Sequence, residues 1–133
     1  MTTLFIIDDR ESVRQALAQR LNRAPGIQVV GAASASQEGI LQARTLRPDV
    51  VLLEPKLVGG HGLDALPAIR ADNPSTRVII LTSYVDDFEL EVAMRLGAER
   101  YLLKDIDSQR LADTILGRDE VPDKPPVQEA VDG

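Results

Sequence analysis

Carboxylate, hydroxyl and ammonium side chains stand where four short apolar segments of the chain end. These residues are Asp8, Asp9, Glu54, Thr82 and Lys104. Clustered carboxylates repel one another unless a cation joins them, and oxygen ligands in a shallow site suit Mg²⁺. Lys104 can supply a fixed positive charge and Thr82 a hydroxyl donor, and both suit a phosphoryl group bound to a carboxylate between them. The residue types therefore indicate a site for Mg²⁺ and phosphoryl chemistry, provided that the fold brings them together.

Apolar segments alternate with amphipathic segments along the chain. The apolar segments span residues 4–8, 27–33, 49–53, 77–82 and 100–103 and are short and mostly rich in Val, Ile and Leu, as buried parallel strands are. Apolar residues at helical spacing span 11–23, 36–46, 62–72, 86–96 and 107–117. This alternation predicts an α/β fold whose parallel sheet is covered on both faces. The polar residues above then lie at the carboxyl ends of the strands, where open parallel sheets place their functional groups.

Two of the helical segments carry more specific expectations. Pro67, inside 62–72, predicts a late helix start or a kink. In 86–96 the helical period places Phe88 and Val92 on the buried face and Leu90 on the opposite side, which makes Leu90 the candidate for a contact surface. Asp86 and Asp87 are expected to cap this helix.

The composition bounds the kind of protein. A chain of 133 residues with 44% hydrophobic and 27% charged residues is typical of one globular domain. The absence of cysteine excludes a disulfide framework and a thiolate metal site. A net charge of -6 argues against nucleic-acid binding by this segment itself. No secretory signal or membrane span is visible at the N-terminus, so we expect a cytoplasmic protein with no membrane contact.

The composition changes at residue 118. Residues 118–126 contain three prolines and have no apolar period. We therefore predict a packed domain over residues 1–117 and an acidic, Pro-rich linker or disordered tail over 118–133. A linker usually joins two parts, which is consistent with a longer protein.

Together these motifs resemble a response-regulator receiver domain of the NarL/FixJ group. The matching segments are residues 6–9, 47–54, 62, 80–83 and 97–105. The resemblance implies a flavodoxin-like doubly wound (βα)5 fold with a five-stranded parallel sheet in the order 2-1-3-4-5. It also implies a C-terminal LuxR-like helix-turn-helix outside this chain, through which any DNA contact would be made. Receivers of this kind act by pairing with themselves or with an output domain, so a homodimer is expected.

The resemblance also implies the role of each site residue. Asp8 and Asp9 would be the acidic pair that holds Mg²⁺, with Glu54 and the backbone carbonyl of Lys56 as further ligands. Thr82 would be the switch hydroxyl, Tyr101 the aromatic side chain that moves with it, and Lys104 the phosphate partner. Glu54 occupies the phosphoacceptor position, where the family has Asp.

Glutamate at the acceptor position changes the expected chemistry. The extra methylene of Glu54 displaces the carboxylate by about 1.5 Å, and a displacement of about 1 Å can cost a hundredfold in rate. We therefore expect a receiver that works without phosphorylation, with weak or no Mg²⁺ binding. In one hypothesis Glu54 partly imitates a phosphoryl group, which carries a charge of about -1.5 to -2, and favours the active state. In the other, given equal weight, Glu54 forms an inert salt bridge with Lys104.

Two other functions remain as alternatives. The chain could be a stand-alone adaptor that acts through protein contacts. It could also be a small Mg²⁺-dependent phosphatase with Asp8 as nucleophile, although such enzymes usually have a second aspartate two residues later, where Arg10 stands. We therefore expect no enzyme activity. The only histidine, His61, is expected to be an exposed loop residue. The sequence does not identify a sensor kinase.

Overall fold

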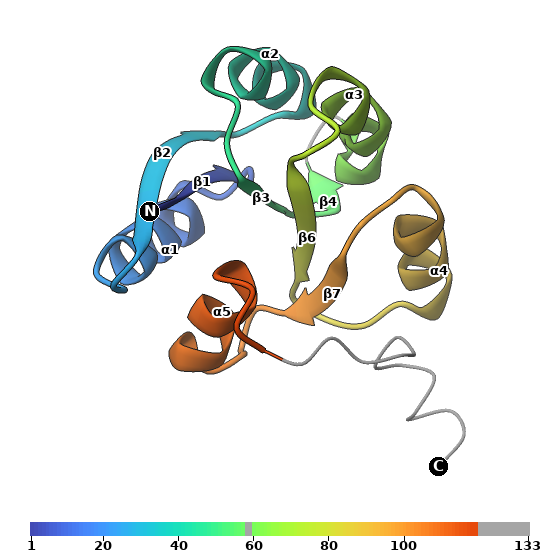
Figure 1. The fold of residues 1–133 in the computed structure, drawn as a ribbon. Helices are drawn as coiled ribbons and strands as arrows, with labels where there is room; N and C mark the ends of the chain where they lie inside the picture. Colours follow the sequence, from blue (N-terminus) through green and yellow to red (C-terminus); the bar gives the residue numbers. More distant parts are fainter. Residues whose placement is uncertain (58–59, 120–133) are drawn as a thin grey trace.

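The computed structural model describes residues 1–57 and 60–119 and contains a five-stranded parallel sheet (Figure 1). Its strands are β1 (Thr2–Ile7), β2 (Ile27–Ala33), β3 (Val50–Leu53), β6 (Arg77–Thr82) and β7 (Arg100–Leu103). They lie in the order β2-β1-β3-β6-β7, and all four pairings are parallel. In chain order this is 2-1-3-4-5, so the expected flavodoxin-like topology is confirmed.

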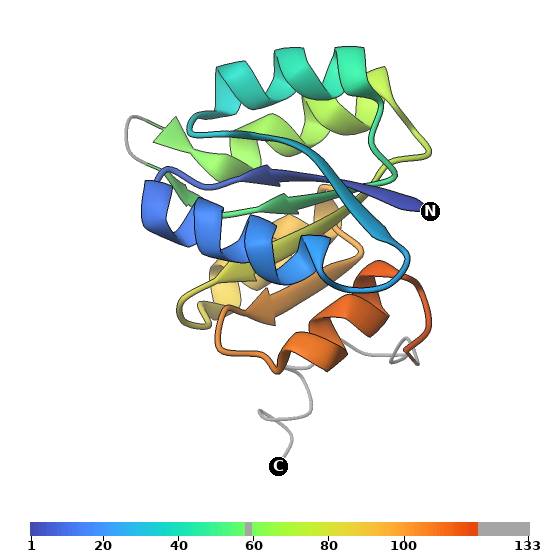
Figure 2. The ribbon, with the colours of Figure 1, turned by 90° about the vertical axis from the view of Figure 1, so that its left-hand side faces the viewer.

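Five α-helices cover the two faces of the sheet. They are α1 (Glu11–Asn22), α2 (Ser36–Leu46), α3 (Ala65–Asp72), α4 (Asp87–Arg95) and α5 (Ser108–Ile115). Figure 1 and Figure 2 show α1 and α5 on one side of the sheet, with α2 and α3 on the other. Each helix and each strand of the sheet begins and ends within three residues of its prediction, because apolar spacing and capping residues are local signals.

Side chains alternate between two cores, as the pleat of a strand requires. Leu4 and Ile6 of β1 pack with α1 and α5 residues such as Leu17 and Leu111. Their neighbours Phe5 and Ile7 face the other core, which contains residues of α3 and α4 such as Leu66 and Leu90. The central strands β1, β3 and β6 are apolar on both sides because both faces are covered. This double burial fixes the strand ends, and with them the site.

The segment after β3 is more elaborate than predicted. A short antiparallel pair, β4 (Lys56–Leu57) with β5 (Gly60–His61), precedes a 3-10 turn, η1 (Gly62–Asp64). The helix itself then begins at Ala65, so the late start that Pro67 predicted is confirmed. Pro67 lies in the first turn, where its missing N–H has no helical partner in any case.

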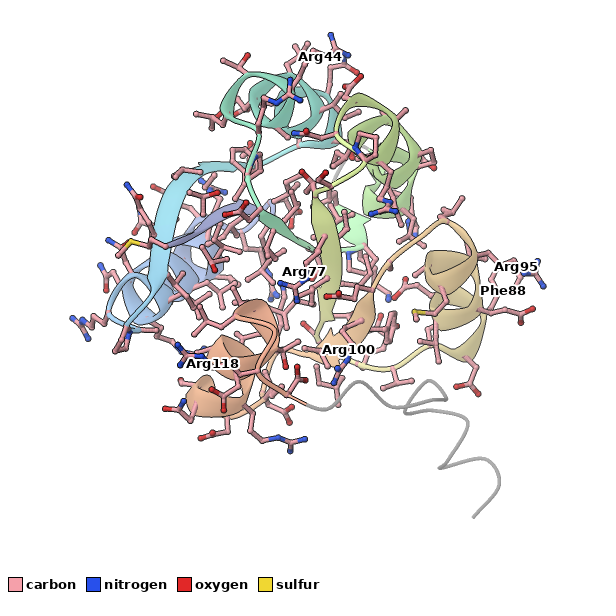
Figure 3. The ribbon with its side chains drawn as sticks, in the orientation of Figure 1. Arg44, Arg77, Phe88, Arg95, Arg100 and Arg118 are labelled. Carbon is pink, nitrogen blue, oxygen red and sulfur yellow. The ribbon has the colours of Figure 1, made fainter. Side chains whose placement is uncertain are left out.

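The prediction for the face of α4 was wrong. Leu90 is buried, with 5% of its surface exposed, whereas Phe88 is 76% exposed. Figure 3 shows Phe88 on the outer side of α4, near Arg95. Glu89 is buried together with Leu90 and Ala93, so the buried face of α4 is centred on these residues and not on Phe88. A period counted from apolar residues alone leaves out a buried charged residue, and the predicted face was therefore placed too close to Phe88.

The residues that follow α5 remain in contact with the sheet. After α5, Gly117 has a φ of 73°, a conformation that ends helices and suits glycine. Asp119 Oδ2 then lies 2.9 Å from Arg100 Nη1 of β7 and accepts a hydrogen bond from the Thr114 hydroxyl. The rest of the predicted tail, 120–133, falls outside the described residues, so the tail remains a prediction. In the described part, no helix has both the length and the apolarity needed to cross a membrane.

Candidate functional site

The strand register brings the predicted site residues to one edge of the sheet. Ile7 of β1 pairs with Leu53 of β3, so Asp8 and Glu54 leave the sheet side by side. The Glu54 N–H donates to the Ile7 carbonyl at 2.9 Å, and the Lys104 N–H donates to the Thr82 carbonyl at 2.7 Å. Parallel strands that end together thus place both carboxylates, the hydroxyl and the ammonium group at one edge.

Lys104 joins two buried carboxylates. Its Nζ lies 2.6 Å from Asp8 Oδ2 and 2.6 Å from Glu54 Oε1. Asp8 and Glu54 are only 1% and 6% exposed, and charges in such surroundings are tolerated only when they are paired. The remaining oxygens also accept hydrogen bonds, Asp8 Oδ1 from the Arg10 N–H and Glu54 Oε2 from the Lys56 N–H, each at 2.9 Å. All four carboxylate oxygens therefore have nitrogen donors.

The groups expected to hold Mg²⁺ were Asp8, Asp9, Glu54 and the Lys56 carbonyl, and oxygens are the ligands that Mg²⁺ prefers. Lys104 Nζ contacts both Asp8 and Glu54, so a metal ion bound to either carboxylate would compete with the ammonium group. Among the residues that the structure describes, no three Asp, Glu or His side chains are grouped to hold a metal ion. Magnesium binding at this edge of the sheet therefore stays a prediction.

Thr82 is at the site, but its hydroxyl is directed elsewhere. It is fully buried, and its Oγ1 donates to the Tyr84 carbonyl at 3.3 Å. Next to it, Arg10 Nη2 donates to Ser83 Oγ at 3.3 Å, which links the loop after β1 to the loop after β6. Sequence reasoning had weighed Arg10 only as the residue that replaces a phosphatase aspartate. The structure shows that it connects the two loops that flank the site.

Glu89 was missed by the sequence analysis. It is a buried glutamate of α4, and its carboxylate receives Lys56 Nζ at 2.9 and 3.1 Å and the Tyr101 hydroxyl at 2.7 Å. His61 Nε2 lies 3.4 Å from the same carboxylate. The one signal in the sequence is that Glu89 interrupts the apolar face of a helix, and its partners lie too far along the chain for a local pattern to reveal them.

Burial and Glu89 together shift the ionisation of Tyr101 and Lys56. Burial, and then the hydrogen bond to Glu89, raise the pKa of Tyr101 well above its ordinary value of 10.0. Burial acts to lower the pKa of Lys56, but the hydrogen bond and the charge of Glu89 raise it more, so the net shift is upward from 10.5. Both shifts preserve the proton: Tyr101 stays neutral and Lys56 stays charged.

The neighbours of Glu89 complete the cluster. Asp86 caps α4 as predicted, because its carboxylate accepts from the Glu89 N–H at 3.0 Å. The Asp86 N–H in turn donates to the Tyr101 hydroxyl at 3.2 Å. His61 is exposed, as expected, but Nδ1 accepts from the Leu63 N–H at 3.2 Å while Nε2 faces Glu89. His61 therefore connects η1 to α4.

The fold and the edge residues define a doubly wound α/β protein with acidic, hydroxyl and lysine groups at the carboxyl ends of its parallel strands. The profile of the response regulator receiver domain matches residues 4–116. The chain belongs to this family, and the relatives described below agree with the NarL/FixJ group.

Relatives with known roles support this assignment. The chain is 37% identical over 115 residues to the transcriptional regulatory protein LiaR of Bacillus subtilis (strain 168), covering 86% of this chain and 54% of LiaR. It is 36% identical over 112 residues to the DNA-binding transcriptional activator DevR/DosR of Mycobacterium tuberculosis (strain ATCC 25618 / H37Rv), covering 84% of this chain and 52% of that protein. The chain thus spans about half the length of these relatives.

A solved structure agrees with the fold. The crystal structure of a LuxR-family two-component response regulator from Aurantimonas sp. SI85-9A1 superposes with a TM-score of 0.83 at 27% identity. The match covers 98% of this chain and 99% of that one. The receiver architecture is therefore common to both.

Proposed function

We propose that this chain is a receiver that works without phosphorylation and controls an output domain through dimerisation or interdomain contacts. The observation that carries the proposal is the contact of Glu54 with Lys104. At the phosphoacceptor position, the carboxylate is longer than aspartate and is already paired with the lysine expected to bind the phosphoryl group. The ammonium group of Lys104 is therefore already engaged by a side chain of this chain.

Phosphoryl transfer requires an attacking oxygen that is free and in line with the donor. Glu54 Oε1 is held by Lys104 and Oε2 by the Lys56 N–H, and the residue is 6% exposed. Attack would therefore require breaking one of these contacts within a buried site. Positioning is most of the catalysis in this reaction, so the expected rate is low.

Of the two hypotheses for Glu54, the ion pair has more structural support than full imitation of a phosphoryl group. An imitation would be expected to attract the Thr82 hydroxyl, which instead donates to the Tyr84 carbonyl. The Lys104 contact is common to both hypotheses. We therefore propose a site whose two buried carboxylates share one internal cation and whose resting state is set by side chains of the chain itself.

The output is proposed to be transcriptional. LiaR and DevR/DosR are a transcriptional regulatory protein and a DNA-binding transcriptional activator, and this chain spans about half of each. We propose that a DNA-binding domain forms the other part of a longer cytoplasmic protein. With a charge of -6, the receiver itself is unsuited to bind DNA.

Intact-mass measurement after treatment with acetyl phosphate and Mg²⁺ tests the proposal. The unmodified chain is expected to show no phosphoryl adduct, and Glu54→Asp is expected to acquire one because it restores the shorter acceptor. Glu54→Gln is the matched control, since it keeps the length and removes the nucleophile. A stable adduct on the unmodified chain that is absent from Glu54→Gln would refute phosphorylation independence.

A further inference from the structure

Glu89 is an acidic side chain within the apolar core. It is 5% exposed and lies in α4 beside Leu90, yet three other elements send a polar group to its carboxylate. The groups are Lys56 Nζ from β4, His61 Nε2 from β5 and the Tyr101 hydroxyl from β7. Burying a carboxylate costs several kcal/mol unless it is paired and hydrogen-bonded, as this one is. The cluster formed by Lys56, His61, Glu89 and Tyr101 is called the Glu89 cluster below.

The Glu89 cluster is connected to the acceptor position. The Lys56 N–H donates to Glu54 Oε2 at 2.9 Å, while the side chain of the same lysine pairs with Glu89. Glu89 in turn accepts from Tyr101 at 2.7 Å. Polar contacts therefore link Glu54 to the Lys56 backbone, the Lys56 ammonium group to Glu89, and Glu89 to Tyr101. This path does not pass through the Thr82 hydroxyl.

Tyr101 depends on Glu89 for its buried position. Its side chain is 4% exposed, and its hydroxyl donates to Glu89 and accepts from the Asp86 N–H. Without the carboxylate, the hydroxyl would be a buried donor with no acceptor, which is unfavourable. Rotation of the ring toward solvent would relieve that cost.

We infer that Glu89 is the positioning residue of the switch, holding Tyr101 in its buried position and coupling it through Lys56 to the segment that follows Glu54. This deepens the proposed function and rests on it for its regulatory meaning. Tyr101, Lys56 in β4 and His61 in β5 contact the same carboxylate, so the positions of these side chains depend on one another. The contacts of the Glu89 cluster therefore determine how the Tyr101 ring divides its time between the buried and the exposed position.

The Tyr101 ring can be observed directly by NMR. The chain has two tyrosines, so Tyr84→Phe leaves Tyr101 as the only one. Phenylalanine keeps the aromatic ring that the Lys56 ammonium group contacts, 4.6 Å from the Tyr84 ring centroid. In this background, with ¹³C-labelled tyrosine, Glu89→Met, which keeps the length of the side chain and removes the acceptor, is expected to shift the Tyr101 ring resonances and to weaken the NOEs from the ring to Leu90 and other core residues. Glu91→Met on the same helix, at an exposed residue paired with Arg95, is the matched control and is expected to leave both unchanged.

A second variant tests the coupling through Lys56. Lys56→Met is expected to move the Tyr101 resonances in the same direction as Glu89→Met, because it removes the cation that holds the carboxylate in place. A folded Glu89→Met protein with the Tyr101 resonances and NOEs of its parent would overturn the inference. If Glu89→Met does not fold, an unchanged Tyr101 signal in Lys56→Met would overturn it instead. Neither NMR measurement involves phosphorylation. A phosphoryl adduct found by intact mass would therefore contradict the proposed function but would not contradict this inference.

Discussion

Lys104 Nζ lies 2.6 Å from Glu54 Oε1, so the residue that we propose for the phosphoacceptor position is in direct contact with the lysine that we propose as the phosphate partner. The same ammonium group lies 2.6 Å from Asp8 Oδ2. One lysine thus offsets part of the repulsion between two carboxylates.

Loss of Lys104 should destabilise the fold strongly. Lys104→Met keeps the length and the apolar stem but leaves Asp8 and Glu54 buried together without a cation. Removing one partner of a buried pair costs about 3–5 kcal/mol, and urea denaturation would measure the change in the free energy of unfolding. The double variant Lys104→Met/Glu54→Gln should recover part of the loss, because one of the two negative charges is gone.

A surface pair provides the control for this prediction. Arg95 and Glu91 form an exposed ion pair on α4, and such pairs contribute about 0–1 kcal/mol. Arg95→Met should therefore change stability little. A loss in Lys104→Met no larger than that in Arg95→Met would contradict the role of Lys104 as the buried counter-ion.

The orientation of α4 predicts opposite effects for two neighbouring apolar residues. Leu90→Ala removes a buried side chain from the core shared with α3 and should cost about 2–5 kcal/mol. Phe88→Ala removes an exposed ring and should stay within about 0.5 kcal/mol of the parent. Thermal or urea unfolding of both variants measures the difference. The reverse ranking would show that the helix faces the other way.

Gly62 should tolerate no side chain. A Cβ at this position would overlap the carbonyl oxygen of Glu54 and touch the backbone of Pro55, neither of which can move without shifting the site. Gly62→Ala should cost about 1–3 kcal/mol through overpacking. Gly39→Ala is the comparison, because its Cβ meets only the Ile7 side chain and alanine favours the helix by up to about 1 kcal/mol. An equal loss of stability in Gly62→Ala and Gly39→Ala would argue against a close approach of the Gly62 backbone to Glu54.

Stability should fall in alkaline solution because of Tyr101 and Lys56. The pKa of each is raised above its ordinary value, 10.0 for Tyr101 and 10.5 for Lys56. Above those values the unfolded chain loses protons that the folded chain keeps, so the unfolded state binds fewer protons and the free energy of unfolding decreases as pH rises. The stabilisation is complete below about pH 10 and is lost as pH increases further.

Urea midpoints measured from about pH 9 to pH 11 would show this dependence. Tyr101→Phe removes one of the two groups and should flatten the slope. A slope unaffected by Tyr101→Phe would mean that the Tyr101 hydroxyl does not keep its proton in the folded state.

Local patterns in the sequence were sufficient for the main elements of the fold and for the polar residues that follow its strands. Short apolar segments predicted all five strands of the main sheet, because a strand buried on both faces leaves a continuous apolar signal. The residues that follow those strands, Asp8, Glu54, Thr82 and Lys104, could be selected because parallel strands end at a common edge. The small β4–β5 pair gave no such signal, since two-residue strands carry no period.

The contacts between these residues, and the face that α4 buries, were decided only by the tertiary structure. Glu89 and Lys56 are 33 positions apart and Lys104 and Asp8 are 96 apart, and no local periodicity encodes a pair at such distances. A charged side chain can enter a core only when the folded chain brings it a partner. For that reason the sequence alone placed Phe88 on the core face and gave no role to Glu89, whereas the folded protein buries the glutamate against Lys56 and Tyr101 and leaves the phenylalanine exposed.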